Sequence, residues 1–317
     1  MKALLLMAFG SPRSPEDADS FLARLLGRTP PSALVERVKE KYRLIGGESP
    51  LLAITEQQAK ALEEKLNARG HPLRSYVGML YSEPLIEETL RGILRDGFEE
   101  VVALPMTPFR SRYTTGAYRE ALGQANRLLG NRLNLTVVEG WHLHPLFLQS
   151  ISERIEEGLT PYGLEERRKV HLLFTAHSLP ESVAGEDPYV SDMVQSVKGV
   201  LNRLGPVSWH LAFQSRGGGP GRWLGPDVET VLVELKRIGV RDVLLVPIGF
   251  VSDHIEVLYD IDRVYREKAG SFGMRLRRTQ SLNCSETFLE ALALAIEKTL
   301  GSSDGKNPRI QTEKDAS

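Results

Sequence analysis

The sequence predicts an α/β protein made of two parallel sheets flanked by helices. Short apolar runs alternate with amphipathic stretches along most of the chain, which is the pattern of strand–helix units in parallel sheets. At 317 residues the chain is long enough for two domains of ordinary size. Two segments of the first half also reappear in the second half, which favours two similar lobes with a cleft between them.

Short runs rich in apolar residues are expected to be the strands. Four lie in each half of the chain, at residues 3–8, 73–79, 100–105, 133–138, 170–176, 206–212, 241–248 and 273–277.

The stretches between these runs are expected to be helices. One opens at Ser14, which is followed by a proline at the first helical position. Another opens at Thr55, because Thr55-Glu-Gln-Gln58 fits a capping box. The others cover about residues 32–44, 84–96, 113–129, 145–158, 189–204, 227–238, 254–267 and 285–300.

The repeated segments predict where the lobes divide. Residues 4–12 match residues 172–180, since both read strand, alanine, aromatic ring, turn and proline, and residues 101–109 resemble residues 243–250. Ligand contacts are expected from the loops after residues 8, 105, 176 and 248. The predicted units are an N-terminal α/β lobe at 1–145, a C-terminal α/β lobe at 146–300 and a disordered polar tail at 301–317.

Composition excludes several classes of function. The formal net charge of −1 provides no global field to attract nucleic acid or an anionic membrane. The single cysteine, Cys284, excludes an internal disulfide framework and a four-cysteine zinc or iron–sulfur site within one chain. The apolar N-terminal run is too short for a signal peptide, and no stretch approaches the ~20 apolar residues of a membrane-spanning helix. We therefore expect a cytoplasmic protein.

His177 stands where an apolar run, residues 172–176, stops at a turn. The carboxyl end of a strand is where ligands bind in open α/β sheets, which favours a functional histidine. The alternative is that Ser178-Leu-Pro-Glu181 forms a capping box and that His177 is merely its neighbour. Position alone does not decide between the two.

Glu256 follows another expected strand and has a similar alternative. Asp253-His-Ile-Glu256 fits a capping box, yet the same helix face continues to Asp260, and three carboxylates at one helix start suit a divalent cation. His254 is expected to be structural. A histidine and a glutamate at two strand ends of one sheet can face each other across a cleft. His177 and Glu256 are therefore predicted to carry the chemistry.

The longest glycine-rich stretch, residues 214–227, lacks the glycine–lysine–hydroxyl motif of a phosphate loop and the dinucleotide-binding fingerprint. We expect a flexible loop that ends in a helix cap at Asp227, with Trp223 packed over a flat or apolar surface.

Taken together, the motifs are specific. They occur in the order Gly10-Ser-Pro12, Tyr42-x-x-Ile45-Gly-Gly-x-Ser-Pro-Leu51, Ile54-Thr-Glu-Gln-Gln58, Ala176-His-Ser-Leu-Pro180, Gln214-Ser, Trp223-Leu-Gly-Pro-Asp-Val228 and Pro247-x-Gly-Phe-Val-x-Asp-His-x-Glu-Val-Leu-Tyr-Asp260. Over about residues 3–300 the chain resembles ferrochelatase, most closely the soluble form of Gram-positive bacteria that acts on coproporphyrin.

That resemblance implies two flavodoxin-like lobes with a porphyrin cleft between them, and insertion of Fe²⁺ into coproporphyrin III in haem biosynthesis. His177 and Glu256 fall on the family's metal-handling pair, with Asp260 as an outer acidic relay. Fe²⁺ is then a substrate, and neither a permanently bound cofactor nor an iron–sulfur cluster is implied. The porphyrin and Fe²⁺ are the expected partners of a protein that we expect to be monomeric.

The resemblance also implies which residues bind the porphyrin. Phe9 falls near the ring, and Ser49 and Tyr118 fall on propionate-binding positions. The remaining predicted porphyrin-binding residues are the basic candidates Arg28 and Lys41, together with Tyr42.

The chain departs from the Gram-positive pattern at several positions. Phe9 stands in place of a tyrosine able to ligate iron, and Tyr81 in place of a histidine near the cleft mouth. Leu25 and Leu26 replace two arginines that meet a propionate, and Val264 replaces a carboxylate of the outer acidic row. Substrate placement and the acidic row are therefore expected to differ here.

Three alternatives stay open at this point: a protoporphyrin IX ferrochelatase, a sirohydrochlorin cobaltochelatase, and a non-catalytic tetrapyrrole carrier with the same cleft. The cobaltochelatases usually rely on more histidines than the single histidine paired with glutamate in this pattern. The sequence also leaves open which of His177 and Glu256 is the base and which the metal ligand.

Overall fold

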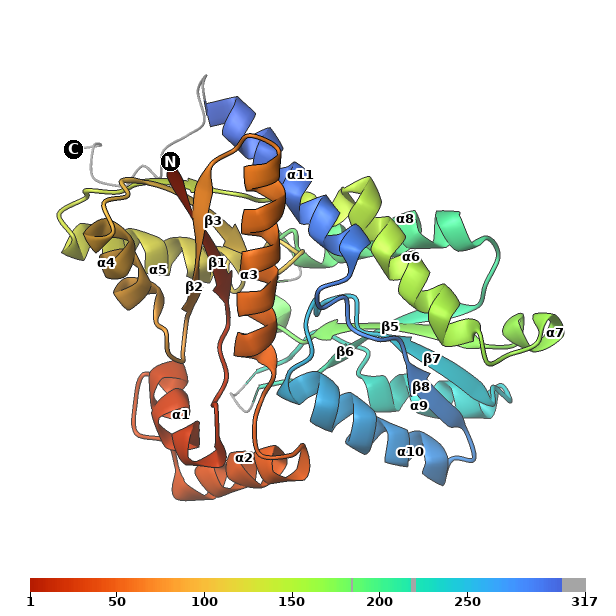
Figure 1. The fold of residues 1–317 in the computed structure, drawn as a ribbon. Helices are drawn as coiled ribbons and strands as arrows, with labels where there is room; N and C mark the ends of the chain where they lie inside the picture. The colour runs from red at the N-terminus through yellow and green to blue at the C-terminus, as the bar shows by residue number, and fades with distance from the viewer. Residues whose placement is uncertain (184, 218–220, 304–317) are drawn as a thin grey trace.

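Residues 1–183, 185–217 and 221–303, which the computed structural model describes, form two four-stranded parallel sheets (Figure 1). The N-terminal sheet has the order β2-β1-β3-β4 and the C-terminal sheet the order β6-β5-β7-β8, so both place the strands in the same relative order, that of flavodoxin-like folds. The predicted strands are confirmed within a few residues. Their bounds are β1 Lys2–Ala8, β2 Leu73–Met79, β3 Glu100–Pro105, β4 Asn134–Val137, β5 His171–His177, β6 Trp209–Gln214, β7 Asp242–Val246 and β8 Arg275–Arg278.

Helices connect the strands and cover the sheets. In the N-terminal lobe they are η1 Pro15–Asp17, α1 Ala18–Leu26, α2 Ser32–Leu44, α3 Leu51–Ala68, α4 Ile86–Arg95 and α5 Thr115–Leu128. The rest of the described chain has η2 Trp141–Leu143, α6 Pro145–Leu159, α7 Leu164–Arg167, η3 Glu181–Val183, α8 Tyr189–Leu204, α9 Val228–Arg237, the π-helix η4 Glu256–Tyr265, α10 Arg266–Ser271 and α11 Glu286–Ser303.

Three helix predictions need correction. The capping box at Thr55 is wrong: α3 begins at Leu51, so Thr55 lies inside the helix and its hydroxyl donates to the Leu51 carbonyl at 2.7 Å. The helix expected at 254–267 is a π-helix followed by α10. The last helix continues to Ser303, three residues into the predicted tail, and residues 304–317 lie outside the described part of the chain.

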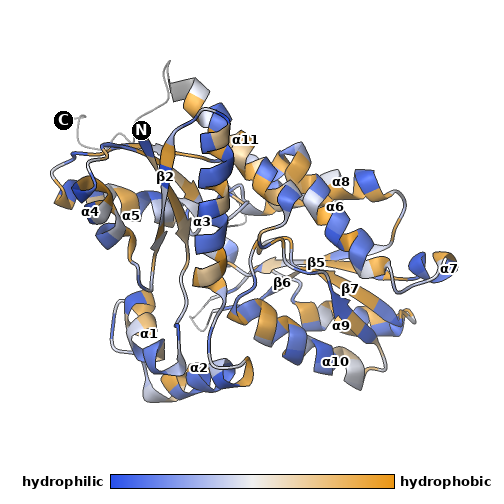
Figure 2. Cartoon of the chain, in the orientation of Figure 1, coloured by the Kyte–Doolittle hydropathy of each residue, from blue (hydrophilic) through white to orange (hydrophobic). Residues whose placement is uncertain are grey.

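The central strands are buried on both faces because helices cover both sides of each sheet. In β1 the side chains from Ala3 to Met7 are 0% exposed, and in β5 those from Leu172 to Phe174 are 0% exposed. Figure 2 shows the matching pattern, with hydrophobic colour in β5 and β7 and mixed colours along the helices around them. Continuous apolar runs are what strands buried in this way require.

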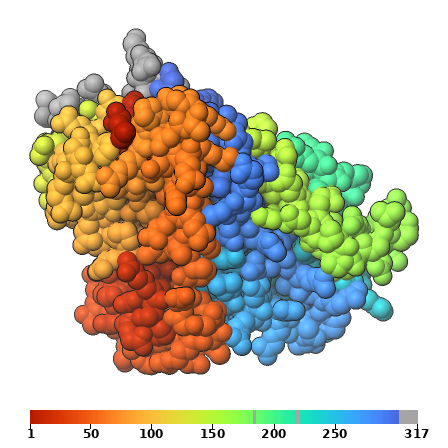
Figure 3. Space-filling model, viewed as in Figure 1, coloured from red at the N-terminus to blue at the C-terminus, as the bar shows by residue number. Residues whose placement is uncertain are grey.

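The two lobes are joined on one side by α11, which packs against α6 and against α3 of the N-terminal lobe. Figure 3 shows this blue helix between the orange N-terminal lobe and the yellow-green segment. One buried cluster accordingly contains Leu4 and Leu62 from the N-terminal lobe together with Leu172 and Phe288. The lobes therefore share part of one hydrophobic core.

The loop after β3 joins the lobes on another side. Arg110 donates two side-chain hydrogen bonds to the fully buried Asp192 of α8, at 2.9 and 2.8 Å. Ser111 donates to Asp187 at 2.9 Å. Charge-assisted pairs of this geometry are among the stronger polar contacts in proteins. Within the described residues, no helix combines the length and the hydropathy needed to span a membrane.

Candidate active site

The structure brings the predicted histidine and glutamate together. His177 is the last residue of β5, and Glu256 is the first residue of η4, after the loop that follows β7. His177 Nε2 lies 3.5 Å from Glu256 Oε1, and the two side chains are 35% and 26% exposed. The pair is thus shielded in part but open to a ligand.

A close backbone approach makes this meeting possible. The Gly249 amide donates to the Thr175 carbonyl at 3.1 Å, so the loop after β7 lies directly on the end of β5. A Cβ atom at position 249 would stand 2.5 Å from the Cβ of Ala176, closer than real Cβ contacts. Only glycine fits this crossing, which lets the loop lead on to Glu256.

A backbone carbonyl fixes the tautomer of His177. Nδ1 lies 2.6 Å from the Ser178 carbonyl oxygen, and since a carbonyl only accepts, Nδ1 carries the hydrogen. In the neutral ring Nε2 then has its lone pair free on the side of Glu256. The Tyr189 hydroxyl donates to the His177 carbonyl at 2.9 Å and so holds the backbone.

The capping interpretation of residues 178–181 is wrong. The Ser178 hydroxyl donates to the carbonyl of Leu224 at 2.8 Å, across the neighbouring loop rather than to a helix. The Glu181 amide likewise donates to the Arg222 carbonyl at 2.8 Å. His177 is therefore not the neighbour of a helix cap.

The capping interpretation of Glu256 is wrong as well. Its would-be partner Asp253 donates its amide to Asn283 at 2.9 Å and pairs its carboxylate with Arg278 at 3.2 Å. Asp253 is thus occupied elsewhere, and the predicted cluster of three carboxylates does not form. Across the described part of the chain, no group of three or more His, Cys, Asp or Glu side chains could hold a metal ion.

The two oxygens of the Glu256 carboxylate differ in their surroundings. Its Oε2 atom is buried and has no hydrogen-bond partner among the described residues, and His254 Nε2 lies 4.0 Å from it. The Glu256 backbone carbonyl accepts from Gln214 Nε2 at 3.3 Å, which holds the residue in place. A buried carboxylate oxygen without a donor is costly, and a proton or a cation would relieve that cost.

Asp260 lies one turn further along η4 and is bound on both oxygens. Lys41 Nζ, from α2 of the other lobe, donates to Oδ1 at 3.1 Å, and the Ser215 hydroxyl donates to Oδ2 at 2.7 Å. The Asp260 side chain is only 13% exposed. Lys41, predicted to accompany the propionates, thus pairs with the predicted outer acidic residue in this structure.

The three aromatic residues predicted to bind the porphyrin differ in how much surface they offer. Phe9 is 46% exposed and lies edge-on to Tyr81, with ring centres 4.8 Å apart. Tyr42 is 1% exposed; burial raises the pKa of its phenol, and the nearby Glu256 carboxylate also raises it. Tyr118 is 5% exposed, and burial raises its pKa too. Of these three rings only Phe9 presents a substantial free face.

Apart from the buried Tyr118, the predicted propionate partners and the departing positions lie mostly near the surface. Ser49 is half-buried and accepts from the Leu51 amide at 3.4 Å, while Arg28 is exposed after α1. Leu25 packs against the small cluster of α1 and α2, and Leu26 is 39% exposed. Val264 packs against the core of the C-terminal lobe, so it supplies no polar group to the site.

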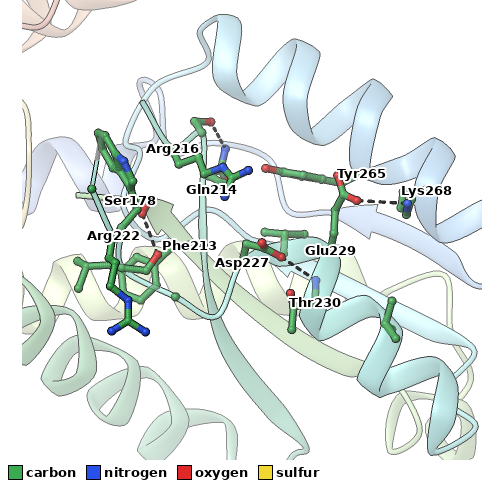
Figure 4. A pocket seen from close by; sticks show the side chains of 17 residues that line it. Ser178, Phe213, Gln214, Arg216, Arg222, Asp227, Glu229, Thr230, Tyr265 and Lys268 are labelled. Carbon is green, nitrogen blue, oxygen red and sulfur yellow. Dashed lines mark hydrogen bonds and ion pairs between the residues drawn. The ribbon is translucent and has the colours of Figure 1, made fainter. Parts of the chain in front are cut away.

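A cavity of about 710 Å³ lies at the end of β6 (Figure 4). Ser178, Gln214 and Ser215 form part of its wall, whereas His177 and Glu256 do not line it. The start of α9 and the side chains of Tyr265 and Lys268 form another part.

The glycine-rich loop borders this cavity. The predicted cap is confirmed, since Asp227 Oδ1 accepts from the Thr230 amide at 2.7 Å. Trp223 packs directly over Gly217, where a Cβ would lie 2.5 Å from the indole. Residues 218–220 of the predicted flexible loop lie outside the described residues.

Comparison with known proteins identifies the family. The family model described as Ferrochelatase matches residues 1–300. A ferrochelatase from Geotalea uraniireducens is 39% identical over 322 residues, which cover 95% of this chain and 98% of that protein. A coproporphyrin III ferrochelatase from Geobacillus sp. is 34% identical, covering 94% of this chain and 97% of that protein. The chain belongs to the ferrochelatase family, whose members are lyases that insert a metal ion into a porphyrin.

Solved structures agree on the fold. SirB from Bacillus subtilis with Fe³⁺ superposes with a TM-score of 0.60 at 14% identity and covers 96% of this chain and 98% of that one. A sirohydrochlorin chelatase SirB in complex with cobalt gives a TM-score of 0.57, also at 14% identity. At this identity the likeness establishes the two-lobed α/β architecture alone.

Proposed function

We propose that this protein inserts Fe²⁺ into coproporphyrin III, with His177 and Glu256 handling the metal ion and the pyrrole protons. One observation carries the proposal: a histidine whose tautomer leaves Nε2 open lies 3.5 Å from a glutamate whose other oxygen is buried and has no hydrogen-bond partner among the described residues. Imidazole and carboxylate together suit a borderline divalent cation.

The reaction exchanges two pyrrole N–H protons for one Fe²⁺ ion, without a change of oxidation state. Neutral His177 accepts a proton or binds the ion through Nε2, the nitrogen that its tautomer leaves open. Glu256 takes the complementary part through its carboxylate, whose Oε1 atom faces His177. Asp260, held by Lys41 and Ser215, is the next carboxylate along the helix and a candidate to receive protons on their way to solvent.

The choice of coproporphyrin III in this proposal rests on the number of propionates that each porphyrin carries. Coproporphyrin III carries four propionates and protoporphyrin IX two, so the former gains more from cationic or hydrogen-bonding partners. The relative from Geobacillus named for coproporphyrin III supports that choice, as do exposed Arg28 and half-buried Ser49. Lys41 is already paired with Asp260, and Leu25 and Leu26 replace cationic candidates. We therefore propose a modest preference for coproporphyrin III.

A side-by-side assay tests the substrate. Loss of free-porphyrin fluorescence with Fe²⁺ under anaerobic conditions gives kcat/KM for coproporphyrin III, protoporphyrin IX and sirohydrochlorin. We expect coproporphyrin III to exceed protoporphyrin IX by roughly tenfold, or ~1.4 kcal/mol, and sirohydrochlorin to give negligible turnover, also with Co²⁺. An equal or higher value for protoporphyrin IX contradicts the proposed substrate. Binding without any insertion would instead indicate a tetrapyrrole carrier.

We also propose that the enzyme works as a cytoplasmic monomer without a permanently bound cofactor. The single cysteine supports the absence of a four-cysteine iron–sulfur cluster within one chain. Cell fractionation, sedimentation and metal analysis of the purified protein test the three parts separately.

A further inference from the structure

The loop that carries Glu256 is held by a residue far along the chain, Asn283, which uses all four of its hydrogen-bonding groups. Its amide donates to the Val251 carbonyl at 2.8 Å, and its own carbonyl accepts from Gln58 Nε2 at 2.7 Å. Its side chain makes two hydrogen bonds with Asp253: Oδ1 accepts from the Asp253 amide at 2.9 Å, and Nδ2 donates to the Asp253 carboxylate at 2.8 Å.

Asp253 is fixed from further directions. The Ser281 hydroxyl donates to its carboxylate at 2.8 Å, and Arg278 pairs with the same carboxylate oxygen at 3.2 Å. The next residue, His254, accepts the first hydrogen bonds of the helix through its carbonyl, from the amides of Val257 and Leu258. Fixing Asp253 therefore fixes the start of η4, where Glu256 stands.

The backbone of Asn283 matches this role. Its φ is +43°, in the left-handed region that asparagine tolerates better than most side chains. A change to an ordinary residue would thus lose both the side-chain contacts and a favourable backbone conformation.

The same residue connects the loop to the other lobe. Gln58, in α3, is 0% exposed and donates both to the Asn283 carbonyl and to the Ser252 hydroxyl, the latter at 3.1 Å. A contact from the N-terminal lobe thus reaches Asn283 and Ser252, and Ser252 belongs to the loop that leads to Glu256.

We propose that Asn283 is a positioning residue for metal insertion. It holds Glu256 at its distance from His177 through Asp253, and it ties that geometry to the N-terminal lobe through Gln58. The inference rests on the proposed role of Glu256. Displacement of a reacting group by about 1 Å is enough to cost ~10²-fold in rate.

Asn283→Gly gives the first test, because glycine keeps the left-handed backbone and both main-chain contacts while removing the grip on Asp253. With Zn²⁺ and coproporphyrin III as probes, we expect kcat to fall by at least about tenfold. The porphyrin Kd, measured by fluorescence quenching, should stay within about twofold of wild type.

A matched control separates positioning from stability. Asp242 makes a comparable carboxylate–arginine pair with Arg275, at 2.7 and 2.8 Å. The two residues begin β7 and β8, at the ends of these strands that point away from Glu256. Asp242→Ala should lower Tm while keeping kcat. Equal kcat losses in the two variants would overturn the proposal.

Two further variants keep the test decisive if Asn283→Gly folds poorly. Ser281→Ala removes one bond from Asp253 and should reduce kcat by about two- to threefold with Tm close to wild type. The exchange Asp253→Asn with Asn283→Asp re-forms the side-chain pair with donor and acceptor reversed, and should exceed the single Asn283→Asp variant in kcat. An unchanged kcat in Ser281→Ala together with no gain from the exchange contradicts positioning.

Glu256→Gln, measured in parallel, distinguishes a failure of the proposed function from a failure of the role proposed for Asn283. If it retains full activity, the proposed function of the pair fails. If it is inactive while Asn283→Gly has wild-type kcat, only the role of Asn283 fails.

Discussion

The two lobes have the same strand order, yet the residues that follow corresponding strands differ in kind. Strand β1 ends at Ala8 and is followed by Phe9, an aromatic ring that is 46% exposed. Strand β5, its counterpart, ends at His177, whose Nε2 faces a carboxylate. One lobe thus presents an apolar face at the position where the other presents an imidazole nitrogen.

The loops after β3 and β7 also occupy corresponding positions, and they differ in whether their charged group is paired. The loop after β3 carries Arg110, whose guanidinium is bound to Asp192 and joins the lobes, whereas the loop after β7 leads to Glu256 with its unpartnered oxygen. The sheets therefore supply equivalent positions, and the loops decide whether a position stabilises the fold or does chemistry.

The largest effect is expected at the carboxyl end of β5, where His177 lies. His177→Ala should lower the rate of metal insertion by about 10³-fold, because it removes the open imidazole nitrogen. Porphyrin Kd should remain within about tenfold of wild type. Insertion kinetics and fluorescence titration check the two quantities, and a variant that keeps more than a tenth of the wild-type rate would remove His177 from the mechanism.

Glu256→Gln should rank next, with a loss of about 10²-fold in rate. The free energy of unfolding should change by less than ~1 kcal/mol, since the buried Oε2 atom has no partner to lose and the backbone contact to Gln214 is kept. Activity and urea denaturation of the same preparation check this. Wild-type activity at an unchanged denaturation midpoint would contradict the assignment.

The amino-terminal ends of β1 and β5 also differ, and this difference predicts how the stability of the protein changes at acid pH. Strand β1 begins with an exposed Lys2–Glu100 pair, whereas β5 begins with His171, which is 4% exposed and 2.7 Å from His210. Burial, and then repulsion from His210, lower the pKa of His171 to about 4. The unfolded chain, with a histidine pKa of about 6.5, binds the proton first as pH falls.

Stability from His171 is therefore complete above about pH 6.5 and is lost as pH falls towards 4, by roughly 2 kcal/mol at pH 5. The slope of the unfolding free energy between pH 7 and pH 5 should be smaller in His171→Leu than in wild type. Urea denaturation at the two pH values will measure it. Lys2→Met is the matched change in the other lobe and should leave the slope as it is. Identical slopes in wild type and His171→Leu would contradict the prediction.

The smallest effect is expected from the aromatic counterpart of His177. Phe9→Ala removes a ring face and should raise the porphyrin KM by about fivefold, or ~1 kcal/mol, with kcat within about twofold. This is the reverse of the pattern expected for His177→Ala. Steady-state kinetics for the two variants under the same conditions check the contrast, which would disappear if Phe9→Ala lost mainly kcat.

Much of the fold and the central pair could be predicted because the signals are local. The apolar run of β5 and the turn after it lie within ten residues, so the sequence places His177 at a strand end. Two capping patterns that the sequence offers, at Thr55–Gln58 and at Asp253–Glu256, do not form for the converse reason: each fits locally, but the packing of distant segments determines the hydrogen bonds that form.

Two α/β lobes, their strands, the ferrochelatase motifs and the residue types at the carboxyl ends of the strands can thus be predicted from local patterns, because periodicity and turn chemistry act over a few residues. Which distant groups meet depends instead on tertiary packing. Lys41 and Asp260 are 219 positions apart, and Gln58 and Asn283 are 225 apart. Such partners depend on how the two lobes pack, since a buried polar group takes whichever donor or acceptor the packing brings within reach.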